Sequence, residues 1–254
     1  MNPQPRDMRR AWRRTFAVQS VWNYPTMIGP GLAYAMLPLL RRIHAGDPPA
    51  LEAAMLRHLE SFNSHPYLSA VAVGALARME ADGASEDEIR RFRTALRGPL
   101  GTLGDRTIWA EWRPLCLLLG ITLFAVGASP LVSALAFLVP YNAGHLWVRY
   151  WGFRRGWEHG RTVGRLLREF PLERLTDRLW PVTMFLLGAA AVLLGREIFA
   201  TAGPGAVSLP LLLVAGLTAV PAFRWPNRFG RLAIGLLLAI PVIWTLLALL
   251  GGGP

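Results

Sequence analysis

The stretch that decides the fold is residues 114–148, PLCLLLGITLFAVGASPLVSALAFLVPYNAGHLWV, which contains no Asp, Glu or Arg. A helix that crosses a bilayer needs about 17–25 mostly apolar residues. The stretch is therefore long enough for two short spans. We expect them to separate near Ser129-Pro130, because a proline does not continue the helix that precedes it.

Three further runs without Asp, Glu or Arg follow, at 179–195, 198–223 and 232–254, and each fits one span. The composition of the whole chain agrees, since 53% of its residues are hydrophobic and only 17% are charged. Soluble domains carry about 25% charged residues. The sequence therefore predicts an all-α polytopic membrane protein with several transmembrane helices.

The basic residues of the chain are all arginine, 27 in number, and the net charge is +11. Such a charge often indicates nucleic acid as a partner. Here, however, the arginines lie between apolar runs, as expected for loops that stay in the cytoplasm. We therefore expect no nucleic acid. We predict a multi-pass protein of the inner (plasma) membrane, in contact with lipid, with a cytoplasmic N-terminus and a last span that ends outside.

The segment 149–178 is rich in arginine and is predicted to be cytoplasmic. Phe153 and Trp157 are four residues apart in this segment, as are Leu166 and Phe170. The spacing is typical of amphipathic helices that lie on a membrane surface. A surface for a cytoplasmic partner is the alternative.

Residues 15–40 carry no charge but are interrupted by Pro25, Pro30 and Pro38. Residues 67–77 are apolar but too short to cross a bilayer alone. Short apolar pieces with Gly and Pro breaks indicate re-entrant or broken helices, which are tolerated at membrane depth where protein or a water-filled cavity covers them. In transporters, broken helices build the substrate site.

Residues 78–97 are polar by contrast, and they predict a cytoplasmic helix that Ser85 caps, with Glu88 completing a capping box. We therefore divide the chain into two parts. An N-terminal half, 1–113, holds the re-entrant or broken helices and the cytoplasmic helix. A transmembrane half, 114–254, includes the arginine-rich amphipathic segment.

The polar cluster in ESFNSHP is the strongest candidate for a substrate site, and its side chains are Glu60, Asn63, Ser64 and His65. Sugar hydroxyls need paired donors and acceptors, which these residue types supply. Polar side chains buried in a membrane are costly and usually functional. The alternative is a helix cap, since Asn63 or Ser64 before Pro66 is a common helix start.

Two weaker candidates lie on either side of this cluster in the sequence. Asp105, in GPLGTLGDRTIW, follows two glycine turns and either contacts substrate or caps a helix after a Gly-rich hinge. Trp22 and Asn23, in VQSVWNYP, combine an aromatic ring with an amide, which suits sugar binding. A Trp at the membrane interface is the common alternative.

One further polar group, Asn142, His145 and Arg149, has spacings of three and four that place its members on one helical face. We favour a polar clamp between helices there over catalysis. The single Cys116 lies in an apolar run, and no metal-binding or nucleophile motif occurs in the sequence. We therefore expect no catalytic residue, no metal and no cofactor.

Five stretches, in order along the chain, give the sequence a family resemblance. It resembles the IID membrane component of the mannose/fructose/sorbose family of the bacterial sugar phosphotransferase system (PTS), over roughly residues 14–160. The stretches are FAVQSVWNYPTMIGPGLAYAMLPLLRRI, RHLESFNSHPYLSA, GALARMEADG, RGPLGTLGDRTIWAEWRP and YNAGHLWVRYWGFRRGWEHG.

The resemblance implies a non-catalytic translocation subunit. A IID protein pairs with a IIC membrane subunit, in a hetero-oligomer, to carry a hexose-type sugar into the cell. Cytoplasmic IIA and IIB proteins relay phosphate to that sugar, and no residue of the IID chain is phosphorylated. The resemblance implies substrate-binding roles for the polar residues of the broken helices. They are Asn63, Ser64, His65, Glu60, Trp22, Asn23 and Asp105.

The chain departs from the family pattern after Asp105, where Arg106 stands in place of a small or apolar residue. Arg106 either pairs with Asp105 or alters the sugar site. The alternative to active transport is a regulatory or scaffold membrane protein of an incomplete phosphotransferase system.

Overall fold

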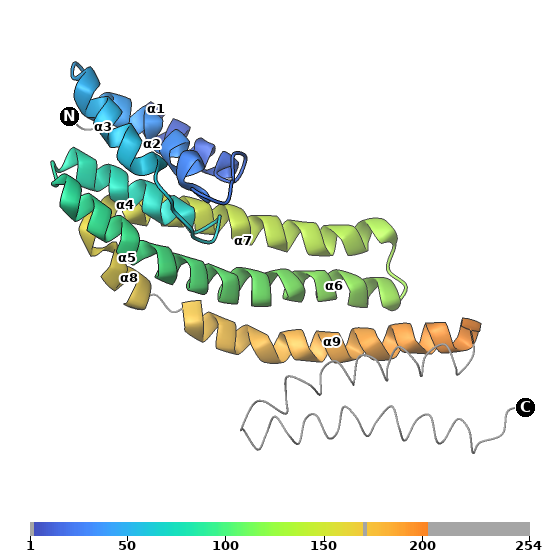
Figure 1. The fold of residues 1–254 in the computed structure, drawn as a ribbon. Coiled ribbons are helices and arrows are strands. Elements are labelled where there is room, and N and C mark those ends of the chain that lie inside the picture. The colour runs from blue at the N-terminus through green and yellow to red at the C-terminus, as the bar shows by residue number, and fades with distance from the viewer. Residues whose placement is uncertain (1–2, 170–171, 203–254) are drawn as a thin grey trace, which may run out of the picture. The chain divides into compact units, whose positions relative to one another are not determined.

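A computed structural model describes residues 3–169 and 172–202, and these residues form helices and connecting loops without a strand (Figure 1). The elements are, in chain order, α1 Pro5–Arg14, η1 Thr15–Ala17, α2 Gly29–Ile43, α3 Pro48–Leu59, α4 Ser69–Ala81, α5 Glu86–Gly104, η2 Asp105–Trp112, α6 Arg113–Ala125, α7 Pro130–His159, η3 Gly160–Thr162, α8 Val163–Glu169 and α9 Leu172–Ala202.

The chain divides into two compact units. The first comprises Met1–Phe124 and Ala128–Leu186, and the second comprises Ala125–Gly127 and Leu187–Pro254. All side chains discussed below belong to the first unit. The spans predicted at 205–223 and 232–254, and the end of the last span, lie outside the described residues.

Helix α4 is the centre of the first unit, and 11 of its 13 residues are buried. A helix that is apolar all round needs neighbours on every side, and α2, α5 and α7 supply them (Figure 1). The approach to α7 is close because glycines face the contact: a Cβ on Gly74 would lie 2.3 Å from the carbonyl oxygen of Phe153. Protein thus covers the short apolar run of the sequence. Its depth in the membrane stays a prediction.

Helix α2 contains Pro38 without a break, so the interruption predicted there is wrong. Pro30 lies in the first turn, where a missing N–H costs nothing. Pro38 has no N–H for the carbonyl group of Tyr34, one turn earlier. The Arg14 side chain donates to that carbonyl oxygen instead, at 3.2 Å. A tertiary contact therefore replaces the lost helical hydrogen bond.

Helix α5 begins as predicted, with the capping box of Ser85 and Glu88. It then runs through Gly98, Pro99 and Gly101 to Gly104 and continues into the π-helical η2. The predicted hinge is therefore absent from this stretch, and Asp105 is not an N-cap, because it is the first residue of η2 and Gly104 precedes it as the N-cap. Propensity is a weak prior that tertiary packing overrides.

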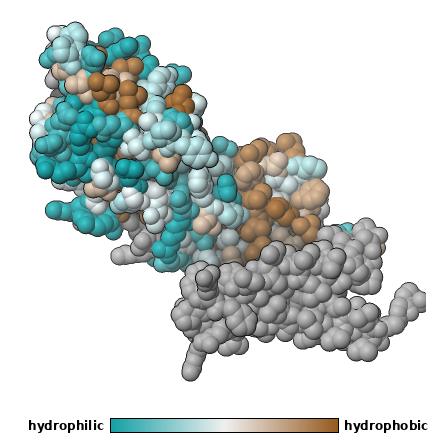
Figure 2. Space-filling model, viewed as in Figure 1, coloured by the Kyte–Doolittle hydropathy of each residue, from teal (hydrophilic) through white to brown (hydrophobic). Residues whose placement is uncertain are grey.

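Three helices of the described part are long and apolar enough to cross a membrane, within Glu86–Ala125, Pro130–Arg168 and Leu175–Glu197. The break predicted at Ser129-Pro130 is confirmed, and Ser129 caps α7 through its hydroxyl group. Large apolar side chains such as Phe124 and Leu131 are exposed on α6 and α7. Figure 2 shows hydrophobic side chains gathered on one part of the coloured surface and hydrophilic ones over much of the remaining coloured surface. The chain is a membrane protein.

The arginine-rich segment is not a separate surface helix throughout. Its first part continues α7 to His159, and Phe153 is buried in the core instead of facing a membrane surface. Gly152 and Gly156 allow the close contact with α4 that buries Phe153. The prediction of an interfacial face at Phe153 is therefore wrong. The cytoplasmic location of the segment stays a prediction.

Candidate functional site

Two loops that are far apart in the sequence meet through main-chain hydrogen bonds. The Phe62 N–H donates to the carbonyl oxygen of Thr26 at 3.1 Å, and the Ile28 N–H donates to that of Phe62 at 3.0 Å. The Asn23 side chain stabilises its own loop, because its Oδ1 accepts from the N–H and the hydroxyl group of Thr26 at 2.9 and 2.8 Å. The loop that carries Trp22 thus lies beside the loop that carries Asn63.

Arg93 on α5 fixes the second loop. Its guanidinium is buried and donates to the carbonyl oxygens of His58, Glu60 and Ser61. An arginine at the C-terminus of a helix satisfies carbonyl groups that have no partner within the helix, and here the helix is α3. The Glu60 carboxylate pairs with Arg90 and Arg93. Glu60 therefore anchors the loop.

His65 is fully enclosed at the end of this loop. A Cβ on Gly104 would lie 2.2 Å from the His65 Cβ, so the ring needs a glycine beside it. The Trp109 ring lies 4.8 Å away, between centroids. The Tyr67 N–H donates to His65 Nδ1 at 3.2 Å. Burial lowers the pKa of His65 to about 4, so the ring is neutral and carries its proton on Nε2.

His65 Nε2 and Ser64 Oγ are both buried, and neither has a hydrogen-bond partner in residues 3–169 and 172–202. More than nine in ten buried polar groups of folded proteins have a partner. An unpartnered buried donor costs about 1–3 kcal/mol. These two neighbouring groups are available for hydrogen bonds with a ligand or a partner.

The other side of the site belongs to α7. The Tyr67 ring stacks on His145 at 4.3 Å, and its hydroxyl group contacts that of Tyr141 at 2.5 Å. The Arg149 guanidinium lies 4.8 Å from the Tyr67 ring centroid and donates to the carbonyl oxygen of Thr15 in η1. Both ring nitrogens of His145 are buried without a partner in the described residues.

We call this group the His65 cluster. Its members are Ser64, His65, Tyr67, Trp109, Tyr141, His145 and Arg149. The cluster combines hydrogen-bonding groups, aromatic rings and one buried cation. This combination of groups is chemically suited to a neutral polyhydroxyl ligand. No group of three His, Cys, Asp or Glu side chains in the described part of the chain is placed to hold a metal ion.

The structure brings together some of the residues that the sequence predicts for the site. Ser64 and His65 are buried in the His65 cluster, and Asn63 is exposed beside them. Trp22 is 45% exposed on the neighbouring loop. Asp105 is exposed at the start of η2, directly after Gly104.

The capping alternative for Asn63 and Ser64 is wrong, because α4 begins later, with Leu68 at the N-cap. Arg106 pairs with Asp177 of α9 at 3.3 Å. The prediction of a polar clamp on α7 is confirmed for Arg149, which donates to the carbonyl oxygen of Thr15. His145 contacts Phe16 and Tyr67 through its ring only. The prediction is wrong for Asn142, which donates to the Leu138 carbonyl oxygen of its own helix.

Sequence reasoning missed Tyr67, Trp109 and Tyr141. Tyr141 stands one residue before Asn142 in the stretch YNAGH, and Tyr67 follows Pro66 directly. Their proximity to polar candidates is the only sign of their role in the sequence. The contact between Tyr67 and Tyr141 joins positions that are 74 residues apart, and no local sequence pattern reveals it.

A second buried polar group lies at the other end of α4. The Glu80 carboxylate accepts from Arg57 Nε and Nη2 at 2.7 and 2.9 Å, and from His58 Nε2 at 2.9 Å. Burial alone would raise the pKa of Glu80, but the hydrogen bonds from Arg57 and His58 outweigh it and lower the pKa to about 2. Burial lowers the pKa of His58, which is therefore a neutral donor. We call these three residues the Glu80 cluster.

Comparison with known proteins gives a consistent result. Residues 4–194 match the family described as PTS system mannose/fructose/sorbose family IID component. The chain is 31% identical over 188 residues to the PTS system mannose-specific EIID component of Escherichia coli (strain K12), covering 72% of this chain and 66% of that protein. It is 30% identical over 173 residues to the fructose permease IID component of Bacillus subtilis (strain 168), covering 66% and 62%.

Two solved structures are similar. One, titled as the structure of a membrane protein, has a TM-score of 0.67 and 28% identity, covering 75% of this chain and 71% of that one. The other is a chain of the mannose transporter ManYZ in complex with microcin E492 (MceA), with a TM-score of 0.59, 29% identity and coverage of 75% and 70%.

The chain thus spans somewhat less than two thirds of the length of the E. coli and B. subtilis relatives. The family match covers α1 to most of α9 and includes both the His65 cluster and the Glu80 cluster. The chain belongs to the mannose/fructose/sorbose family of PTS IID components.

Proposed function

We propose that this chain is the IID membrane subunit of a mannose-type PTS permease. Together with a IIC subunit it forms the path of a hexose-type sugar, whose uptake is coupled to phosphorylation by IIA and IIB proteins. The observation that carries the proposal is the pair of buried, unpartnered polar groups of Ser64 and His65. The family match and the similarity to a chain of a mannose transporter support it.

The chemistry of His65 defines its role in this proposal. Because Nδ1 accepts from the Tyr67 N–H, the neutral ring offers Nε2–H as a donor. A sugar hydroxyl oxygen accepts that hydrogen bond, and the Ser64 hydroxyl group forms a hydrogen bond with a second sugar hydroxyl group. Trp109 is 41% exposed and covers the His65 ring. Its displacement opens the way for the sugar.

The remaining predicted residues surround this centre. Asn63 and Trp22, both exposed on the paired loops, contact the sugar at the rim. Asp105 contacts it from the start of η2. Glu60 and Asn23 belong to the same substrate-binding set, and their present hydrogen bonds and ion pairs hold the two loops in place.

The chain contributes translocation and leaves phosphotransfer to its partners. In the proposed complex, the IIA and IIB proteins carry the phosphate, and no residue of this chain is phosphorylated. The N-terminus and the arginine-rich segment face the cytoplasm, where the phosphate-carrying proteins act. The short helices α2 and α4 of the N-terminal half lie at membrane depth against the IIC subunit.

The test is sugar binding by the complex purified after co-expression with its IIC subunit. Asn63→Ala is expected to abolish sugar binding and to leave assembly with IIC intact, because Asn63 is exposed on the surface of the described chain. An unchanged affinity would remove Asn63 from the site. A wild-type complex that binds no sugar of the hexose class would contradict the proposed function as a whole.

A further inference from the structure

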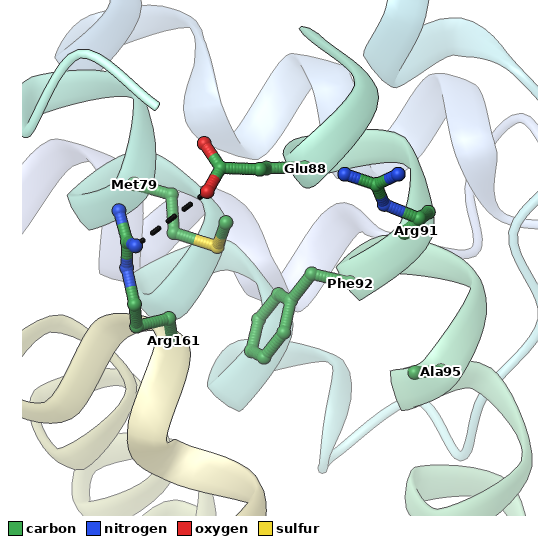
Figure 3. A pocket seen from close by; sticks show the side chains of 6 residues that line it. All are labelled: Met79, Glu88, Arg91, Phe92, Ala95 and Arg161. Carbon is green, nitrogen blue, oxygen red and sulfur yellow. Dashed lines mark ion pairs between the residues drawn. The ribbon is translucent and has the colours of Figure 1, made fainter. Parts of the chain in front are cut away.

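A shallow, open pocket lies away from the His65 cluster, where the first turns of α5 meet the end of α4 and η3 (Figure 3). Its volume is about 330 Å³, at the small end of the range for ligand pockets, about 300–1,000 Å³. The residues that line it are Met79, Glu88, Arg91, Phe92, Ala95 and Arg161.

The floor of the pocket is apolar. Met79 is buried, and Phe92 packs partly buried against the same core. In Figure 3 the sulfur of Met79 and the ring of Phe92 lie close to each other, with Ala95 on the next turn of the helix. Such a floor accepts one aliphatic or aromatic side chain, since burial of apolar surface is favourable.

The charges lie together on one side of this floor. Glu88 pairs with Arg161 at 3.6 Å, and its other carboxylate oxygen accepts from the N–H and hydroxyl group of Ser85. Arg91 extends toward Glu88 from the opposite side in Figure 3, and no ion pair of Arg91 occurs among the described residues. One carboxylate thus stands between two guanidinium groups, so that the rim carries one net positive charge.

The location of the pocket decides its kind of occupant. It is built from the first turns of α5, which the sequence predicts to be cytoplasmic, and from the arginine-rich segment on the same side. Many of the exposed large apolar side chains lie instead on α6 and α7, which belong to helices long and apolar enough to cross a membrane. An aqueous partner therefore reaches the pocket.

We infer that this pocket anchors a water-soluble protein that inserts one apolar side chain and places an adjacent carboxylate against Arg91. An apolar anchor in a small pocket with an arginine at its edge is the usual form of an interface hot spot. The inference rests on the proposed function, which supplies the partner: the IIB protein that delivers phosphate to the sugar.

The experiment titrates purified IIB protein onto the purified IIC complex of this chain. Ala95→Trp fills the pocket from its exposed edge, and Arg91→Glu reverses the charge at its rim. Each is expected to weaken IIB binding at least about tenfold, as loss of a hot spot does, and to leave sugar affinity unchanged. The matched controls are Thr94→Trp and Arg97→Glu, on the same helix but outside the pocket, and both should bind IIB as the wild type does.

Wild-type affinity for IIB in Ala95→Trp and Arg91→Glu would overturn the pocket assignment and leave the proposed function standing. Absence of IIB binding to a sugar-binding wild-type complex would overturn the assignment together with the proposed partner. A phospholipid that co-purifies with the wild type but not with Ala95→Trp, while IIB affinity stays the same, would assign the pocket to lipid and contradict the inference.

Discussion

The two buried polar groups at the ends of α4 differ in how completely they are paired. In the Glu80 cluster both carboxylate oxygens accept hydrogen bonds, and the Arg57 guanidinium donates twice. His58 Nδ1 is the one buried side-chain polar atom of this cluster without a partner in the described residues. In the His65 cluster the side chains of Ser64 and His65 are just as buried, yet their polar atoms Oγ and Nε2 have no partner in the described chain.

This difference in pairing predicts that the Glu80 cluster serves stability and the His65 cluster serves ligand binding. A paired buried charge is costly to disturb, because removal of one partner leaves the other uncompensated. An unpaired donor already carries the cost of burial, so a ligand that supplies the missing acceptor regains that free energy on binding. We therefore expect substitutions in the Glu80 cluster to lower stability and substitutions in the His65 cluster to lower affinity.

The largest expected effect is that of Glu80→Gln. It leaves the buried Arg57 without its carboxylate, and we expect a loss of about 3–5 kcal/mol in the free energy of unfolding. Chemical denaturation of the purified chain in mixed micelles measures it. The control is Asp82→Asn, which removes the exposed pair with Arg78 and should cost less than about 1 kcal/mol. Equal losses in the two variants would contradict the account.

The next effect is a dependence of stability on pH. The pKa of His65 falls from 6.5 to about 4 on folding, so the unfolded state binds the proton first as the pH drops. The contribution of His65 to the free energy of unfolding is therefore complete above pH 6.5 and is lost as the pH falls toward 4. The free energy of unfolding changes by roughly 3 kcal/mol over this range. His58 acts in the same direction, because burial also lowers its pKa.

His65→Gln should flatten the pH dependence of stability over this window, measured as unfolding midpoints at a series of pH values. We expect the pH dependence of stability that remains in this variant to come from His58. Glu80 adds a separate loss at lower pH, as the pH falls from 4.5 toward its pKa of about 2. A variant with the full wild-type slope above pH 4 would show that His65 is not buried as a neutral ring.

The smallest effect on stability is expected for Ser64→Ala. Its hydroxyl group has no partner to lose, so the free energy of unfolding should stay within about 1 kcal/mol of the wild type. Sugar affinity should fall about tenfold, the value of one hydrogen bond. Ser69→Ala is the matched opposite: its hydroxyl group donates to the carbonyl oxygen of Pro66 at 2.7 Å, so stability should fall and affinity should stay. A loss of stability in Ser64→Ala together with a loss of sugar affinity in Ser69→Ala would contradict these assignments.

The sequence predicts the features that local patterns determine. The break at Ser129-Pro130 and the capping box of Ser85 depend on a few adjacent residues, and both are confirmed. Long uncharged runs likewise identify the membrane class, because the bilayer sets their length.

Features that depend on tertiary contacts escaped prediction. Pro38 is tolerated inside α2 because the Arg14 side chain donates a hydrogen bond to the carbonyl group that the proline leaves without a partner. The sequence predicts a Gly-rich hinge that includes Gly104, whereas Gly104 makes room for the ring of His65 within a continuous helix. Of the site, the sequence indicated Ser64 and His65 by residue type, but the contact of Tyr67 with Tyr141 depends on the fold.

The most direct test compares two amide substitutions of His65 in the purified complex with IIC. His65→Gln keeps a donor near the place of Nε2, and His65→Asn keeps a polar atom only near the place of Nδ1. Calorimetric titration with the sugar should give an affinity within a few-fold of the wild type for His65→Gln and a loss of at least about tenfold, 1.4 kcal/mol, for His65→Asn. Equal affinities for both variants and the wild type would contradict the claim that the unpartnered Nε2–H of His65 holds the sugar.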